Sequence, residues 1–148
     1  MQTPFLLHVA DITATVDKPS EVSPTRRVIT ITGGNVLGPK IHGKIVPGGA
    51  DFQFIRANGV AELQARYVIE LDAGGLVYVE NNAMRHGSPE AMERLKRGEP
   101  VDPKEIYFRG AVRMETAAAE YDWLNKHLFI AMGQRFPQHV ELKIFQLL

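Results

Sequence analysis

The sequence contains no cysteine. This excludes disulfide bonds, thiolate metal ligands and cysteine nucleophiles. Serine is also scarce: Ser20, Ser23 and Ser88 are the only three, and none lies in the Gly-x-Ser-x-Gly motif of serine hydrolases. We therefore expect no hydrolase that works through a side-chain nucleophile of either type.

The chain also lacks charge of one sign and long hydrophobic runs. Seventeen basic residues balance seventeen acidic ones, so the positive surplus that nucleic-acid binding requires is missing. No polybasic segment suits anionic lipid, and no apolar run reaches the roughly 18 residues of a membrane-spanning helix. The N-terminus has no basic segment typical of a secretory signal. We expect no nucleic-acid partner, no membrane partner and a cytoplasmic location.

What is present has the composition of a globular domain. The chain has 148 residues, of which 45% are hydrophobic and 23% charged. This length is enough for one domain with its own hydrophobic core. The sequence contains no internal repeat, low-complexity tract or linker, so residues 1–148 are expected to form a single domain.

Turn-forming residues recur at nearly even spacing in the first half of the chain, and the segments between them are rich in Val, Ile, Phe, Tyr and Thr. The turn signals are Gly33-Gly34, Gly38-Pro39, Pro47-Gly48-Gly49, Asn58-Gly59 and Gly74-Gly75. This pattern is typical of an all-β sandwich or barrel. Strands are predicted at residues 5–14, 26–33, 40–46, 51–56, 60–71, 76–85, 105–115, 126–133 and 139–147.

One helix is predicted at about residues 89–97. Ser88 can cap it, Pro89 suits its first position, and Gly98 ends it. A second helical turn is predicted at about residues 118–124. Eight to ten mainly antiparallel strands with one short helix favour a closed β-barrel, because closure removes exposed strand edges. The interior of such a barrel is filled by side chains or holds one small ligand.

Several strands show alternating faces. In residues 60–71, Leu63 and Tyr67 share an apolar face, while Arg66 lies on the polar one. Asn81 and Arg85 share a face of the strand 76–85. The apolar face of the strand 139–147 suits either the barrel core or a homodimer interface.

The strand 105–115 places Tyr107 and Arg109 together on one face. Arginines that face a barrel interior need a buried partner, because an unpaired buried charge is costly. Asp51 or Glu80 would provide one, and a small anionic or carbonyl ligand another, since arginine binds carboxylates through two parallel hydrogen bonds. The alternative is that these arginines coat the outside of the sheet, and alternation alone leaves both options open.

No metal site is expected, because none of the five histidines has the spacing of a zinc-binding pair. His86 remains a candidate general base. The glycine-rich segments 32–40 and 47–51 do not match a phosphate-binding loop and are interpreted as turns. Asp51, at the start of a strand after Gly48-Gly49, is a stronger functional candidate than these glycines.

The runs RRVITITGGNVLGPKIHGKIVPGGADFQF (from Arg26), YFRGAVRMET (from Tyr107) and YDWLNKHLF (from Tyr121) resemble a bacterial and fungal family. It is domain-of-unknown-function family 3237, also called uncharacterised protein family 0311. The resemblance covers nearly the whole chain and implies a small soluble β-barrel with short helical insertions. It does not imply a known reaction.

Six of the residues that match the family pattern have no obvious backbone role. They are Asp51, Arg66, Arg85, Arg109, Trp123 and Asn125. Our hypothesis is that they converge at one mouth of the barrel and bind a small polar or anionic organic molecule.

Three functions remain open. The first is an enzyme without cofactor or metal that isomerises, dehydrates or cyclises an oxygenated metabolite. Asp51 would transfer the proton, and Arg85 and Arg109 would stabilise an oxyanion. Tyr107 and Asn125 would orient the substrate. The predicted ligand-binding residues are Arg66, Tyr67, Asn81, Trp123 and Asn125. The second is a lipocalin-like binding barrel without catalysis, and the third is a solid barrel with a structural or interaction role.

Overall fold

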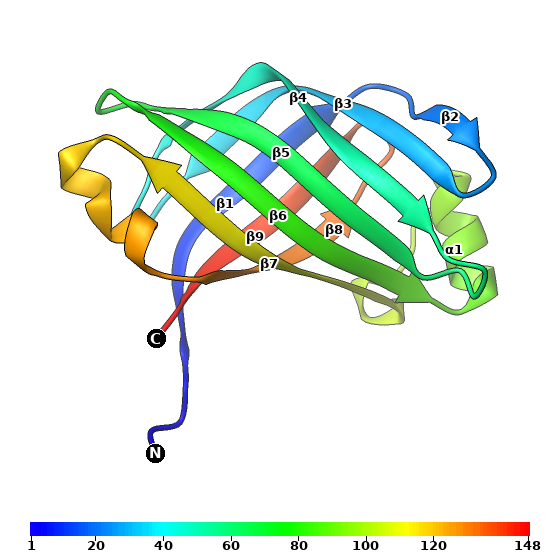
Figure 1. The fold of residues 1–148 in the computed structure, drawn as a ribbon. Helices are drawn as coiled ribbons and strands as arrows, with labels where there is room; N and C mark the ends of the chain where they lie inside the picture. Colours follow the sequence, from blue (N-terminus) through cyan, green and yellow to red (C-terminus); the bar gives the residue numbers. More distant parts are fainter.

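The computed structural model describes residues 1–148 and consists mainly of antiparallel strands wound into a barrel (Figure 1). The strands are β1 (Leu6–Val16), β2 (Ser20–Ser23), β3 (Arg26–Leu37), β4 (Gly43–Ile55), β5 (Ala61–Leu71), β6 (Leu76–Gly87), β7 (Ile106–Thr116), β8 (Phe129–Arg135) and β9 (His139–Leu147). The helical elements are α1 (Pro89–Lys96) and two 3-10 helices, η1 (Pro103–Glu105) and η2 (Ala119–Lys126).

The sheet closes on itself. Its strand order is β1-β9-β8-β7-β6-β5-β4-β3-β2, and β1 also pairs with β3. Eight strands, β1 and β3–β9, therefore form a closed antiparallel barrel, and β2 is an extra strand that pairs with β3 alone. The predicted all-β barrel of eight to ten strands is confirmed.

Two of the predicted turns lie inside strands. The predicted strands 40–46 and 51–56 are parts of one long strand, β4, which passes through Pro47-Gly48-Gly49. The register against β5 shifts between Val46 and Ala50, and a proline is tolerated at such a bulge because no ladder hydrogen bond is lost there. Gly33-Gly34 similarly lies within β3 at a shift in its pairing with β4. The short strand β2 was not predicted.

The helix prediction is confirmed to within one residue. The Ser88 side chain accepts a hydrogen bond of 3.1 Å from the Ala91 backbone N–H at the start of α1. Gly98 follows the helix with a φ of +77°, a conformation that favours glycine. The predicted turn at 118–124 is the 3-10 helix η2, and no helix in the structure has the length and hydrophobicity to cross a membrane.

The two halves of the barrel interior differ in character. Near η2, large apolar side chains such as Ile69, Leu124 and Phe129 are fully buried and fill the space. Near α1, the inward positions include Gln53 and Arg85, which are also buried. The ends of the barrel are therefore unequal, with a packed end at η2 and a polar end at α1.

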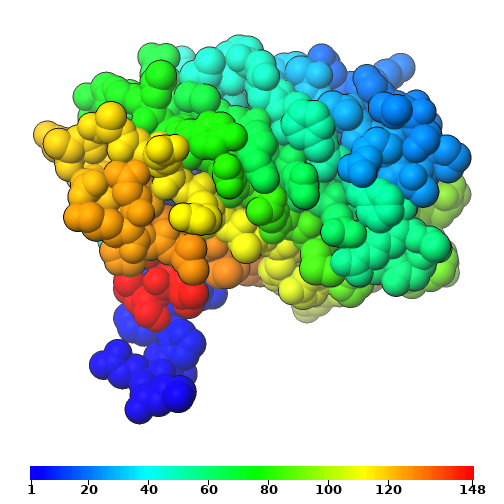
Figure 2. All heavy atoms as spheres, viewed as in Figure 1, coloured from blue at the N-terminus to red at the C-terminus, as the bar shows by residue number.

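The space-filling view shows side chains covering the outer wall (Figure 2). The N-terminal residues, in blue, extend away from the barrel beside the C-terminus, in red. Phe5 and Leu148 exchange two backbone hydrogen bonds at this point. The N-terminal segment therefore lies far from the polar half of the interior.

Candidate functional site

A cavity lies inside the polar half of the barrel. Its volume is about 70 Å³, several times the roughly 10–15 Å³ that one water needs. Apolar side chains, including Ile29, Leu63, Phe108 and Leu142, form much of its wall. Its polar lining residues are Asp17, Asp51, Gln53, Tyr67, Asn81, Arg85 and Arg135. Four of these, Asp51, Tyr67, Asn81 and Arg85, were predicted as site residues.

Strand alternation brings the polar side chains together. Asp51 on β4 lies opposite Ala65 on β5, which in turn lies opposite Asn81 on β6. All three therefore occupy one row across the inner wall, since opposite residues point to the same side of a sheet. Gly110 on β7 makes room for this row, because a Cβ atom there would lie 2.0 Å from Asn81 Oδ1.

Five polar atoms around the cavity are buried without a hydrogen-bond partner. They are Asp51 Oδ1, Gln53 Oε1, Tyr67 Oη, Asn81 Oδ1 and Arg85 Nε. Most buried polar groups in folded proteins are paired, and each one left unpaired costs about 1–3 kcal/mol. Proteins leave polar groups unpaired mainly at functional sites, so five such atoms around one cavity are typical of a functional site.

The Asp51 carboxyl is held by one hydrogen bond and one oxygen is left free. Gln53 Nε2 donates to Asp51 Oδ2 over 2.8 Å, whereas Oδ1 has no partner. Burial raises the pKa of Asp51 above its usual value, and this effect outweighs the hydrogen bond from Gln53 and the attraction of Arg85, Arg27 and Arg66. The protonated carboxyl is therefore favoured more than in water.

The electrostatics of Arg85 and Tyr67 are also set by burial. Burial lowers the pKa of Arg85 to about 9, with the charges of Arg135 and Arg27 adding to this effect and Asp51 opposing it. Arg85 thus remains cationic at neutral pH, and its guanidinium lies 5.6 Å from the centre of the Phe108 ring. Burial raises the pKa of Tyr67, so this phenol keeps its proton and can donate it in a hydrogen bond.

Sequence reasoning missed three residues here: Gln53, Arg27 and Arg135. Gln53 and Arg27 lie opposite each other on β4 and β3, and Arg135 ends β8. Gln53 shares strand parity with Asp51, and Arg27 shares it with the buried Ile29, so alternation carried a signal for both. Arg135 lies beyond the predicted strand 126–133, and no local signal marked it.

Three predicted site residues lie on the outer wall instead. Arg66 donates to the preceding backbone carbonyl over 2.8 Å and to Asn82 Oδ1 over 3.0 Å. Tyr107 stacks on His86 with 4.9 Å between ring centres, so the candidate base His86 also lies outside the barrel. Arg109 donates to the preceding carbonyl over 2.9 Å and lies 5.4 Å from the Tyr107 ring centre. None of the three lines the cavity.

Trp123 and Asn125 lie on η2, at the opposite end of the barrel from α1 (Figure 1). Asn125 Oδ1 accepts from the Thr116 N–H over 2.8 Å, and its Nδ2 donates to the Thr116 carbonyl over 2.9 Å. Trp123 packs against Phe129 with 6.1 Å between ring centres. The expected convergence of these residues with Asp51 and Arg85 at one mouth is therefore corrected: they secure η2 to the packed end.

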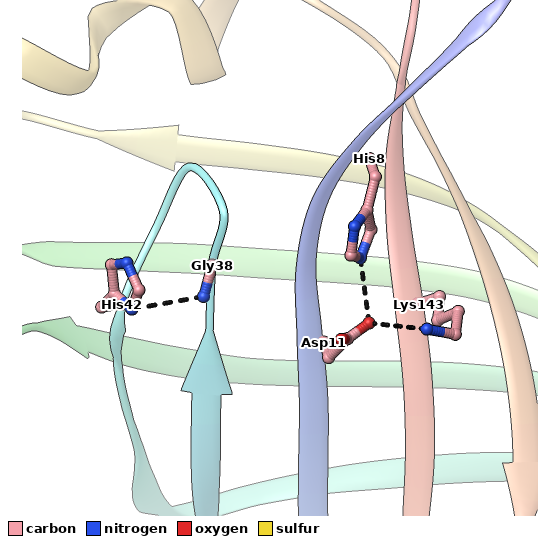
Figure 3. A network of polar contacts seen from close by, with 5 residues as sticks. All are labelled: His8, Asp11, Gly38, His42 and Lys143. Carbon is pink, nitrogen blue, oxygen red and sulfur yellow. Dashed lines mark hydrogen bonds and ion pairs between the residues drawn. The ribbon is translucent and has the colours of Figure 1, made fainter.

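The histidines of β1 and the β3–β4 connection make local contacts on the barrel wall (Figure 3). His8 Nε2 and Lys143 Nζ lie 2.9 and 3.2 Å from the same oxygen of Asp11. His42 Nδ1 accepts a hydrogen bond of 3.3 Å from the Gly38 N–H. The structure contains no group of three or more His, Cys, Asp or Glu side chains placed to hold a metal ion.

Comparisons with known proteins agree with the fold. The model of the family described as "Protein of unknown function (DUF3237)" matches residues 4–147. A UPF0311 protein of Rhodopseudomonas palustris is 50% identical over 83% of this chain and 80% of its own length. A UPF0311 protein of Clostridium acetobutylicum is 41% identical over 94% of this chain and 91% of its own.

Solved structures extend the likeness. A protein of unknown function from Rhodopseudomonas palustris superposes with a TM-score of 0.95 at 44% identity, covering 100% of this chain and 99% of the other. A "beta-barrel like protein" from Acinetobacter baumannii gives 0.84 at 32% identity, with 100% and 98% covered. A protein described as an enzyme from Penicillium herquei shares the fold, with a TM-score of 0.73 at 19% identity and 100% and 97% coverage. Since the family model matches nearly the whole chain and relatives at 41% and 50% identity carry the name UPF0311, the chain belongs to the DUF3237 family.

Proposed function

We propose that the cavity in the polar half of the barrel binds a small polar organic molecule and that Asp51 exchanges a proton with it. The reaction would be an isomerisation, dehydration or cyclisation carried out by the protein's own side chains. The observation that carries this proposal is the set of five buried, partnerless polar atoms on one cavity. A bound molecule with oxygen or nitrogen atoms would satisfy them.

Asp51 has the features of a general acid–base group. Gln53 fixes one carboxyl oxygen over 2.8 Å, so the free Oδ1 keeps a defined position. A raised pKa brings the group closer to neutral pH, where both protonation states are useful for proton transfer. Asp51 would remove a proton from carbon or oxygen in one step and return it in the next.

The neighbouring groups supply the remaining interactions. Arg85 would stabilise negative charge that develops on a substrate oxygen, and this attraction is strengthened because Arg85 is only 2% exposed. Tyr67 would donate a hydrogen bond through its neutral hydroxyl. Asn81 Oδ1 would accept one from a substrate hydroxyl.

A second candidate is a lipocalin-like barrel that binds a ligand without reaction. The wall of the cavity favours this alternative, since it is largely apolar and includes Ile29, Leu63, Phe108 and Leu142. Ligand pockets are usually lined by apolar groups with few polar ones.

Catalysis on this fold has support from one structural neighbour. The Penicillium herquei protein of the same fold is described as an enzyme, so a barrel of this shape can carry catalysis. A cavity also disfavours the third option, a solid scaffold.

The test combines native mass spectrometry with metabolite profiling. Wild-type protein and the Asp51→Asn variant are purified gently from the native host, and bound small molecules are identified by mass. Both proteins are then incubated with a small-molecule extract of that host, and products are separated by liquid chromatography. Asp72→Asn serves as the matched control, because Asp72 is an exposed carboxylate in the turn after β5.

The outcomes separate the candidates. An enzyme predicts that wild type and Asp72→Asn convert one metabolite into an isomer or a dehydrated product, while Asp51→Asn retains the ligand without converting it. A carrier predicts retention by all three proteins without conversion by any. Absence of both retention and conversion in the wild type would contradict ligand binding altogether.

A further inference from the structure

Three arginines face the interior at the α1 end of the barrel. Arg27 comes from the start of β3, Arg85 from the end of β6 and Arg135 from the end of β8. All three line a second cavity, which lies between α1, β2 and the barrel wall and is open to solvent. Arg85 and Arg135 also line the cavity that holds Asp51. The arginine cluster, meaning these three residues, therefore lies where the two cavities adjoin.

The arginine cluster lacks carboxylate partners. None of its members takes part in an ion pair within 4.0 Å, whereas Arg56 and Arg94 each pair with a glutamate at 3.0 Å. Arg85 is only 2% exposed, and the Nε atoms of Arg27 and Arg85 are buried without a hydrogen-bond partner. Arg27 and Arg135 are half-buried, so Arg85 carries most of the cost of burial. A buried cation without partners is costly, so this cluster is better explained by a ligand than by the stability of the fold.

Like charges are crowded at this point. Arg27 and Arg135 both lower the pKa of Arg85, and Arg27 lowers that of Arg135, burial being the largest cause in each case. Asp51 is the single carboxylate among the inward-facing groups and supplies one negative charge against three positive ones. The cluster therefore carries an excess of positive charge in the interior.

The other charged groups of the two cavities lie at their exposed rims. They are Asp17, Glu21, Glu93 and Lys96. Glu93 is engaged at 3.8 Å by Arg97. Exposed charges are screened by water and salt, so they do not neutralise the buried excess.

We infer that the ligand of this barrel is an organic carboxylate whose anionic group binds the arginine cluster, while its remaining part lies beside Asp51 and Tyr67. This inference rests on the proposed function and names the substrate class. Guanidinium groups match the planar carboxylate through two parallel hydrogen bonds. A phosphate monoester fits less well, because its second negative charge would lie close to the Asp51 carboxylate.

The geometry also orients the substrate. The carboxylate points toward α1, and the reacting atoms lie deeper, where Gln53 fixes Asp51. A carbonyl or hydroxyl on the remaining part of the ligand would then reach the partnerless atoms of Tyr67 and Asn81. Hydroxy acids and keto acids are the substrates that such an arrangement suits.

The test is an NMR titration of the ¹⁵N-labelled full-length protein at constant ionic strength. Propionate is compared with propionamide, which has nearly the same shape and no charge. We expect propionate to shift the Nε–H signals of Arg27 and Arg85 saturably, with a Kd about tenfold or more below that of propionamide, as expected for charge-assisted hydrogen bonds. Arg135→Gln and Arg27→Gln should each weaken propionate binding by about tenfold, while Arg113→Gln, on the exposed outer face of β7, should not.

Each outcome decides the inference. Equal Kd values for propionate and propionamide would overturn it while leaving the proposed ligand cavity intact. Tighter binding of methyl phosphate than of propionate would assign the cluster to phosphate instead. No saturable shift with propionate would also overturn it, and the metabolite assay with Asp51→Asn would then judge the proposed function independently. The backbone spectra of the variants show whether they are folded. If one of the two arginine variants does not fold, the other still tests the inference.

Discussion

The charge on Asp51 should destabilise the folded protein at neutral pH. Burial outweighs the attraction of the nearby arginines and raises the pKa of Asp51 above its ordinary value of 3.8, whereas the unfolded chain exposes this carboxyl to water. Asp51→Asn removes the charge, nearly preserves the shape and leaves the amide within reach of Gln53. We expect the variant to be more stable than the wild type at pH 7.

The sign follows from proton linkage. Between pH 3.8 and the folded-state pKa of Asp51, the folded wild type binds more protons than the unfolded chain. Its unfolding free energy therefore falls as the pH rises, by up to about 1.36 kcal/mol per pH unit for one group. The variant lacks this decrease, so the unfolding free energies of the two proteins should be similar below pH 3.8 and should differ increasingly above it. Each kcal/mol corresponds to roughly 2–4 °C in Tm for a protein of this size.

The measurement is urea unfolding of both proteins from about pH 3.5 to about pH 8, with the midpoint and slope fitted at each pH. Asp72→Asn is the matched control, because Asp72 is exposed and its removal should leave the pH profile unchanged. A variant no more stable than the wild type at neutral pH would refute the reasoning. So would a stability difference that does not change with pH.

Three further variants test the packing and the division of the barrel into two ends. Gly110→Ala places a Cβ atom against Asn81 Oδ1, so it should cost about 1–3 kcal/mol in urea unfolding and reduce retention of the host ligand. Phe129→Ala empties a fully buried position and should cost about 3–5 kcal/mol; a loss below about 1 kcal/mol would contradict the packed end. Asn125→Ala removes two hydrogen bonds to Thr116 and should cost about 1–2 kcal/mol without changing ligand retention. If the Asn125→Ala variant no longer retained the host ligand, Asn125 would belong to the binding site.

The architecture was predictable from local pattern. The alternation in residues 60–71 matches β5, in which Leu63 and Tyr67 point inward and are buried. The bounds of α1 were predictable from Ser88, Pro89 and Gly98, because helix ends depend on capping groups that lie close in sequence. Errors arose at Gly33-Gly34 and Pro47-Gly48-Gly49, because the residues that form turns also form bulges within long bent strands.

The candidate site was only partly predictable. Asp51, Tyr67, Asn81 and Arg85 were predicted from the chain and line the cavity. Arg109 carried the same kind of signal as Arg85, yet it lies on the outer wall. Strand alternation shows which residues share a face, but where both faces carry polar residues it does not show which one is inside.

Closure of the sheet decided the rest. The pairing of β1 with β3 makes one face of every strand the interior, and it brings Arg27 and Arg135 to Arg85 from strands far apart in sequence. Strand direction placed Asn125 at the opposite end of the barrel from Asp51, although the sequence resemblance had grouped these two residues in one predicted site. The sequence by itself determined the strands, the helix and the barrel class, because these depend on neighbours along the chain. Only the tertiary structure determined which charges are buried together, because that depends on the strand register and on how the barrel closes.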